Sequence, residues 1–153
     1  MVGKPRNKTH PDPTKVTEDY WVRASSRNDS GTGRYLNSGK WMLFTKVENH
    51  DSVWHKIRVA TEDGQLGYSA KAATSKSNPL AARSSSLLTC VYTVDYEDLD
   101  DVRRVLISLR GLGFPGRLSY KTDTDTRHLI YGPGTALYVS QPDSLDFENR
   151  RTV

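Results

Sequence analysis

Cationic side chains at the ends of predicted strands are the residues of this sequence whose types and spacing could do chemistry. Lys40 opens an apolar run, Lys71 alternates with small apolar residues, and Lys121 precedes a polar turn. Arg127 follows six residues after Lys121. Lys and Arg on strands, beside aromatic and polar neighbours, bind anions such as phosphate through charge-assisted hydrogen bonds. We therefore expect a local anion pocket in which Lys40 and Arg127 hold a phosphate.

The segment from Tyr120 to Arg127 combines two cations, three threonine hydroxyls and two carboxylates in eight residues. This composition predicts ligand contacts from Tyr120, Thr122, Asp123 and Thr126. A solvated turn held by local hydrogen bonds of Asp and Thr fits the same residues. The spacing alone does not separate the two interpretations.

The tryptophans have two interpretations as well. Trp54 falls on an apolar helix face, which predicts a position in the core. Trp21 lies close to Arg23 in a segment without regular periodicity, and it is the better candidate for stacking on a nucleobase. We include Trp21 and Arg23 among the expected ligand contacts, with a core position as the alternative for Trp21.

Several nucleotide-binding and catalytic motifs are absent from the sequence. It has no Gly-x-x-x-x-Gly-Lys-Ser/Thr loop, no strand-bound Gly-x-Gly-x-x-Gly and no Gly-x-Ser-x-Gly elbow. The four histidines have no ligand-like spacing to one another or to Cys90. We expect no metal and no cofactor, with a hard cation held by Asp123 and Asp125 as the less favoured alternative.

Length and charge fit one domain with a basic N-terminal part. The 153 residues hold 22 Lys and Arg against 18 Asp and Glu, and the whole excess lies in residues 1–40. We expect a disordered basic arm at 1–18, one domain at 19–140 and a polar C-terminal tail at 141–153. One cysteine and no apolar run of about 20 residues favour a cytoplasmic protein without a membrane span.

Hydrophobic periodicity predicts an α+β fold with a mainly antiparallel sheet backed by two main helices. We expect helices from Asp51 to about 63 and over 98–111. We expect strands at 41–44, 66–73, 87–94, 117–121 and 135–139. The Ser- and Thr-rich stretch 74–86 is expected to be a long mobile loop that acts as a lid.

Six segments carry a family resemblance: GKWMLF at 39–44, VWHKI at 53–57, GQLGYSAK at 64–71, LRGLG at 109–113, LSYKTD at 118–123 and TR at 126–127. Together, over about residues 21–139, they resemble the basophilic-leukaemia-expressed (Bles) domain family. That family is similar in fold to the cap-binding initiation factor 4E, which implies a curved antiparallel sheet backed by helices. Bacterial members are described as similar to phosphothreonine lyases and eukaryotic members as RNA binders. The four cations Lys40, Lys71, Lys121 and Arg127 match the family pattern.

Two functions are consistent with these residues. The first is a metal-independent enzyme that eliminates phosphate from a phosphorylated small molecule or nucleotide. Lys71 or Lys121 would be the base, and His128 or Tyr131 would protonate the leaving oxygen. The alternative is a non-catalytic module that binds a nucleotide or RNA on the same basic sheet. A scaffold without a ligand is the third and least favoured interpretation.

Overall fold

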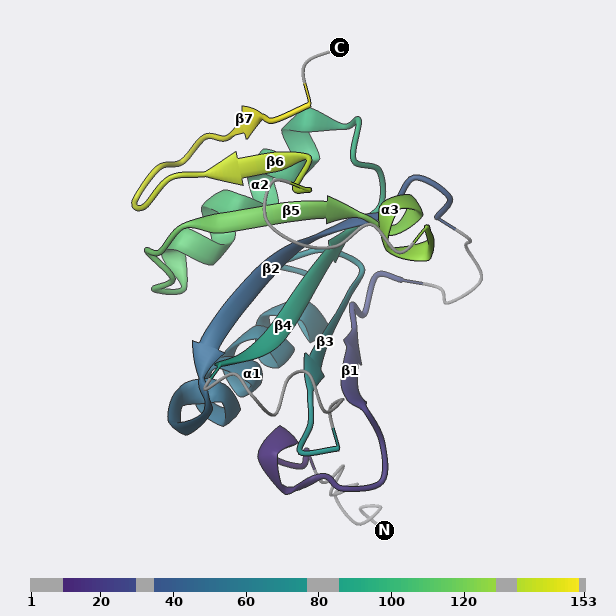
Figure 1. The fold of residues 1–153 in the computed structure, drawn as a ribbon, viewed down its shortest axis with the longest axis vertical. Helices are drawn as coiled ribbons and strands as arrows, with labels where there is room; N and C mark the ends of the chain where they lie inside the picture. The colour runs from purple at the N-terminus through teal and green to yellow at the C-terminus, as the bar shows by residue number, and fades with distance from the viewer. Residues whose placement is uncertain (1–9, 30–34, 77–85, 129–134, 152–153) are drawn as a thin grey trace, which may run out of the picture.

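The structure is a computed structural model that describes residues 10–29, 35–76, 86–128 and 135–151 (Figure 1). The strands and helices, in chain order, are the 3-10 helix η1 (Pro13–Lys15), β1 (Trp21–Ser25), β2 (Gly39–Lys46), α1 (Val47–Glu62), β3 (Ser69–Ala73), β4 (Ser86–Thr93), α2 (Leu99–Gly111), β5 (Leu118–Thr122), α3 (Asp123–Arg127), β6 (Tyr138–Ser140) and β7 (Glu148–Asn149). Most of the expected lid at 74–86 lies outside the described residues.

The seven strands form one curved sheet in the order β1-β3-β4-β2-β5-β6-β7, with antiparallel neighbours throughout. The long strand β2 lies at the centre, where it pairs with β4 over its whole length and with β5 over its first half. The expected α+β class and the mainly antiparallel sheet are confirmed.

The two long helices, α1 and α2, cover one face of the sheet and lie behind it in Figure 1. Their inward side chains follow the helical period and are buried: His50, Trp54, Ile57 and Ala60 from α1, and Val102, Val105, Leu106 and Leu109 from α2. The indole Nε1 of Trp41 on β2 donates to the Val102 carbonyl at 3.1 Å, which ties the sheet to α2. Neither these nor the shorter described helices combine the length and apolarity that crossing a membrane requires.

Alternation along the strands sorts the side chains onto two faces. Trp41, Leu43, Val91 and Tyr120 point toward the helices and belong to the core. The residues between them therefore point to the other face, which α1 and α2 do not cover. We call this the open face.

Two elements differ from the sequence-based expectation. Helix α1 starts at Val47, directly after β2, although Asp51 was the expected cap. The Asp51 carboxylate instead accepts hydrogen bonds from the backbone N–H and the hydroxyl of Thr14, at 2.9 and 2.5 Å. Strand β1 was not predicted, because its order comes from pairing with β3 rather than from its own periodicity.

The terminal segments are held against the domain where the structure describes them. Pro13 of η1 is buried, and the Asp12 carboxylate lies 2.7 Å from Nε2 of His55 on α1. Asp12 and Thr14, which lie in the stretch that we expected to be a disordered arm, therefore contact α1, whereas residues 1–9 lie outside the described residues. In the expected C-terminal tail, β7 extends the sheet and Arg151 pairs with Asp125 at 2.5 Å.

Candidate functional site

Four cations from neighbouring strands share the open face of the sheet. Arg23 on β1 is directly opposite Lys71 on β3, which is opposite Cys90 on β4. In the adjacent row, Lys40 on β2 is opposite Lys121 on β5. Because directly opposed residues of antiparallel strands point to the same face, these side chains gather on one surface. We call Arg23, Lys40, Lys71 and Lys121 the basic cluster.

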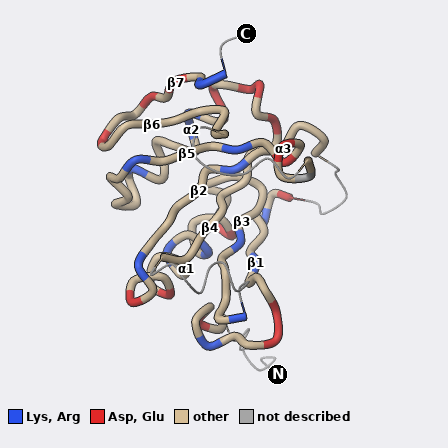
Figure 2. The backbone as a smooth tube through the Cα atoms, viewed as in Figure 1, with Lys and Arg blue, Asp and Glu red and all other residues tan. Residues whose placement is uncertain are grey.

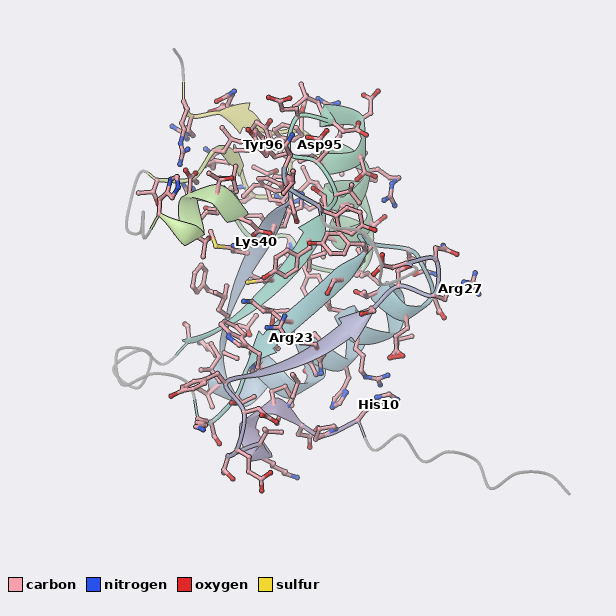
Figure 3. All side chains as sticks on the ribbon, turned by 90° about the vertical axis from the view of Figure 1, so that its right-hand side faces the viewer. His10, Arg23, Arg27, Lys40, Asp95 and Tyr96 are labelled. Atoms are coloured by element: carbon pink, nitrogen blue, oxygen red, sulfur yellow. The ribbon has the colours of Figure 1, made fainter. Side chains whose placement is uncertain are left out.

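The pictures agree with this placement. Figure 2 shows Lys and Arg on neighbouring strands in the middle of the sheet, whereas Asp and Glu lie mostly on helices and connections at its rim. In Figure 3, which is turned by 90°, Arg23 and Lys40 are labelled on strands of the sheet, and the two long helices lie to the right of these strands. The basic cluster therefore occupies the side of the sheet that the two long helices leave open.

Two aromatic rings lie among the cations. The Lys71 ammonium is 3.9 Å from the ring centroid of Trp21 and 5.9 Å from that of Tyr92. The Lys40 ammonium is 5.7 Å from the Tyr92 ring. All three distances fall within the range of cation–π attraction. Trp21 thus lies on a strand and faces the open side, as the stacking hypothesis requires, and Tyr92 is a site residue that sequence reasoning missed.

Lys40 is held in place by two side chains of α3. Its ammonium donates to Asp123 Oδ1 at 2.9 Å and to Thr126 Oγ1 at 2.7 Å, both on α3. The Lys40 side chain is 6% exposed and that of Asp123 is 21% exposed, so this ion pair is largely withdrawn from water. Two of the ammonium's three donors are therefore engaged within the protein, which limits the role of Lys40 as a phosphate clamp.

The short helix α3 replaces the expected polar turn and positions these partners. The Thr122 hydroxyl caps it by accepting from the Asp125 N–H at 3.1 Å. The Asp125 carboxylate at the third position adds negative charge to the first turn, where a helix favours it. As a result, Asp123 and Thr126 lie one turn apart next to Lys40, whereas Thr122 is occupied as the cap.

Burial shifts the ionisation of several groups on the open face toward their neutral forms. Burial, with smaller effects of Arg23 and Lys40, lowers the pKa of Lys71, and burial together with Lys40 lowers the pKa of Lys121. Burial also raises the pKa of the Cys90 thiol to about 11, so this neighbour stays neutral near pH 7.

Carboxylates also lie near the basic cluster. Asp123 acts on Lys71, and Asp125 acts on Lys121. Asp125 also pairs with Arg151. Four cations therefore gather on this face close to Asp123 and Asp125, and these two carboxylates pair with Lys40 and Arg151.

The structure separates the remaining predicted site residues. Tyr120 is fully buried on the helix side, where its ring packs against Trp41 and its hydroxyl lies 2.7 Å from Thr93 Oγ1. It therefore cannot contact a ligand on the open face, because strand alternation points it away from Lys121. His128 is exposed at the C-terminal end of α3. The Arg127 side chain and Tyr131 lie outside the described residues.

A cavity of about 240 Å³ lies away from the basic cluster. Its lining includes Tyr35, Tyr68, Asp101 and Arg104 but no member of the cluster. Arg104 is already paired there with Asp101 at 2.8 Å. We therefore place the candidate site on the open face, where charge and aromatic rings converge, rather than in this cavity.

Metal ligands are scarce in the described part of the chain. It holds no group of three or more His, Cys, Asp or Glu side chains that could bind a metal ion. The two carboxylates of the alternative cation site, Asp123 and Asp125, pair with Lys40 and Arg151. A cation at Asp123 and Asp125 would therefore have to displace two protein cations.

Comparison with protein families gives one match. The sequence model of the family described as basophilic leukemia-expressed protein Bles03 matches residues 32–127. The chain belongs to this family. The Bles03 region spans β2 to α3 and so contains Lys40, Lys71 and Lys121, but it leaves out Trp21 and Arg23. It is narrower than the 21–139 expected from the sequence.

Solved structures of initiation factor eIF4E share the fold. A schistosome eIF4E in complex with m7GpppA and 4E-BP superimposes with a TM-score of 0.52 at 14% identity, covering 68% of this chain and 59% of that chain. Its complex with m7GpppG and 4E-BP gives 0.51, at the same identity and coverage. Ascaris suum eIF4E-3 with m7G cap gives 0.44 at 15% identity, covering 57% and 51%. This chain therefore spans less than two thirds of these proteins. No curated protein matches it.

Proposed function

We propose that the open face of this Bles03-family domain binds a nucleotide through its phosphates. The observation that carries the proposal is the basic cluster: four cations from four of the five consecutive strands β1, β3, β4, β2 and β5, with Trp21 and Tyr92 between them. Phosphate oxygens accept charge-assisted hydrogen bonds from such cations, and an aromatic ring offers a surface for a base. The shared fold with an eIF4E that binds m7GpppA supports the same ligand class.

Affinity that depends on phosphate tests this proposal. We expect GTP to bind more tightly than GMP, and guanosine to bind most weakly, when titrated by calorimetry at low ionic strength. Affinity should fall as salt is added, because screening weakens exposed charge pairs. Trp21 is the tryptophan on the open face, so binding should also change its fluorescence, and Trp21→Phe should remove that change.

Two variants and one control locate the site. Lys71→Met and Lys121→Met keep an apolar stem and remove a charge, and each should weaken GTP binding about tenfold, or about 1.4 kcal/mol. Lys56→Met removes an equal charge from α1, where the ammonium faces Phe114 and the Leu112 carbonyl, and should leave affinity unchanged. Equal affinities for guanosine and GTP, or no binding by the folded protein, would overturn the proposal.

Phosphate elimination is the second candidate function. One observation favours it: burial lowers the pKa values of Lys71 and Lys121, as a lysine base requires. The two lysines, however, lie on strands β3 and β5 with β4 and β2 between them, about 14 Å apart at the backbone. Release of inorganic phosphate from phosphopeptides and phosphorylated metabolites, lost in Lys71→Met, would support catalysis. The comparisons favour binding, and we rank it first.

A further inference from the structure

The two aromatic rings within the basic cluster, Trp21 and Tyr92, each have a lysine against them. The Lys71 ammonium lies over Trp21 at 3.9 Å, and Lys71 and Lys40 both lie within 6 Å of Tyr92. The electron-rich faces of these rings therefore interact with cations of the protein itself. A ligand ring that stacks on either one enters a position with a positive charge nearby.

The charges around the rings reinforce this effect. Arg23 is directly opposite Lys71 in the β1–β3 pair, and Lys40 is directly opposite Lys121 in the β2–β5 pair. Cys90, between Lys71 and β2, is a neutral thiol with a pKa of about 11 and supplies no compensating charge. Asp123 pairs directly with Lys40, and at Lys71 its effect on the pKa is smaller than that of burial.

We infer that the open face selects phosphorylated ligands whose ring is uncharged and discriminates against ligands with a positively charged ring. The inference rests on the proposed nucleotide-binding function and specifies its ligand: an unmethylated purine or pyrimidine nucleotide rather than one with an N7-methylated, cationic guanine. The phosphates are attracted by the basic cluster, and a cationic ring is repelled by the same residues.

The size of the effect follows from the distance between the charges. A ring stacked on the far face of Trp21 would lie about 7 Å from the Lys71 ammonium. At an effective dielectric constant of about 20, the repulsion between two positive unit charges at that separation weakens binding of the cationic ring roughly fifty-fold. Screening by salt reduces the effect. We therefore expect a preference of at least about tenfold for the neutral ring at low ionic strength.

The test compares GTP with 7-methyl-GTP, which carry the same phosphates. Both are titrated into the full chain by calorimetry at low salt and mildly acidic pH, where the methylated ring carries its positive charge. GTP should bind at least tenfold more tightly. In Lys71→Met, the affinity for GTP should fall more than that for 7-methyl-GTP, so the preference narrows. Lys56→Met, on the helix side, should keep the preference of the unchanged protein.

The outcomes separate the inference from the function on which it rests. Equal or tighter binding of 7-methyl-GTP overturns the inference while the nucleotide-binding proposal stands. If the folded Lys71→Met variant prefers GTP as strongly as the unchanged protein does, Lys71 is not the residue that repels the methylated ring. If the folded protein binds neither nucleotide, both the proposed function and the inference fail. Thermal unfolding of each variant shows that it is folded before its affinity is interpreted.

Discussion

The ion pair between Lys40 and Asp123 links the stability of the fold to the charge of the site, and Asp123→Asn tests the link. The substitution keeps a hydrogen-bond acceptor near Lys40 but removes its countercharge. The Lys40 ammonium, on a side chain only 6% exposed, would then be a nearly buried cation without a carboxylate. A hydrogen bond to a charged partner contributes about 1.5 to 3 kcal/mol, so we expect a loss of about 2 kcal/mol. For a chain of this length that corresponds to a melting temperature lower by about 4 to 8 °C.

The same substitution should strengthen ligand binding. Removing the negative charge of a carboxylate 2.9 Å from the Lys40 ammonium makes the open face more positive. We expect Asp123→Asn to bind GTP more tightly while being less stable. A purely structural role for Asp123 predicts the loss of stability without the gain in affinity.

The assay is urea unfolding of four proteins: unchanged, Asp123→Asn, Lys40→Met and the double variant. Residues in direct contact couple by about 0.5 to 3 kcal/mol, so the double variant should be more stable than the sum of the single losses predicts. Asp100→Asn, which removes a fully exposed carboxylate 3.6 Å from Arg103, is the matched control and should leave the stability almost unchanged. Additive losses, or an Asp123→Asn protein as stable as the control, would refute the reasoning.

Three further predictions concern the core. Gly39→Ala should lower the free energy of unfolding measured in urea by about 1 to 3 kcal/mol, because the added Cβ would lie 2.4 Å from the Tyr120 ring. In Gly116→Ala the added Cβ meets nothing within 4 Å, so the loss of stability should be far smaller. Burial lowers the pKa of His50, so below about pH 6.5 the unfolded chain binds more protons than the folded one. The free energy of unfolding should therefore fall as the pH drops, by up to about 1.4 kcal/mol per pH unit. His50→Gln should remove this pH dependence. The buried Cys90 thiol, with its raised pKa, should react with iodoacetamide only on unfolding, and rapid reaction of the native protein would contradict its placement.

The sequence predicts the elements whose periodicity is strong. Helix α2 was expected over 98–111 and spans Leu99–Gly111. Its apolar face and its N-terminal cap predict the same helix, and the Asp98 carboxylate does accept from the Asp101 N–H at 3.2 Å. Strand β4 is similarly close to the prediction. Strand β1 and strand β7 were missed, because each is short and is defined by backbone pairing with a distant segment.

The site could be predicted in part. Lys40, Lys71 and Lys121 were chosen from their positions on strands, and pairing brings them to one face. Tyr120 was chosen with Lys121, although adjacent residues of a strand point to opposite faces, so alternation itself would have excluded one of them. Tyr92 was missed because its importance depends on being opposite Lys40 on another strand.

By itself the sequence determined which residues carry charge, which segments are helical or extended, and therefore the α+β class. The tertiary structure decided which charges meet. Lys40 and Asp123 are separated by 83 residues, and Trp21 and Lys71 by 50. Strand order and register bring each pair into contact, and both result from burying the apolar face of the sheet against α1 and α2. Because that burial involves the whole domain at once, no local pattern could show that the cations left on the open face would gather around its aromatic rings.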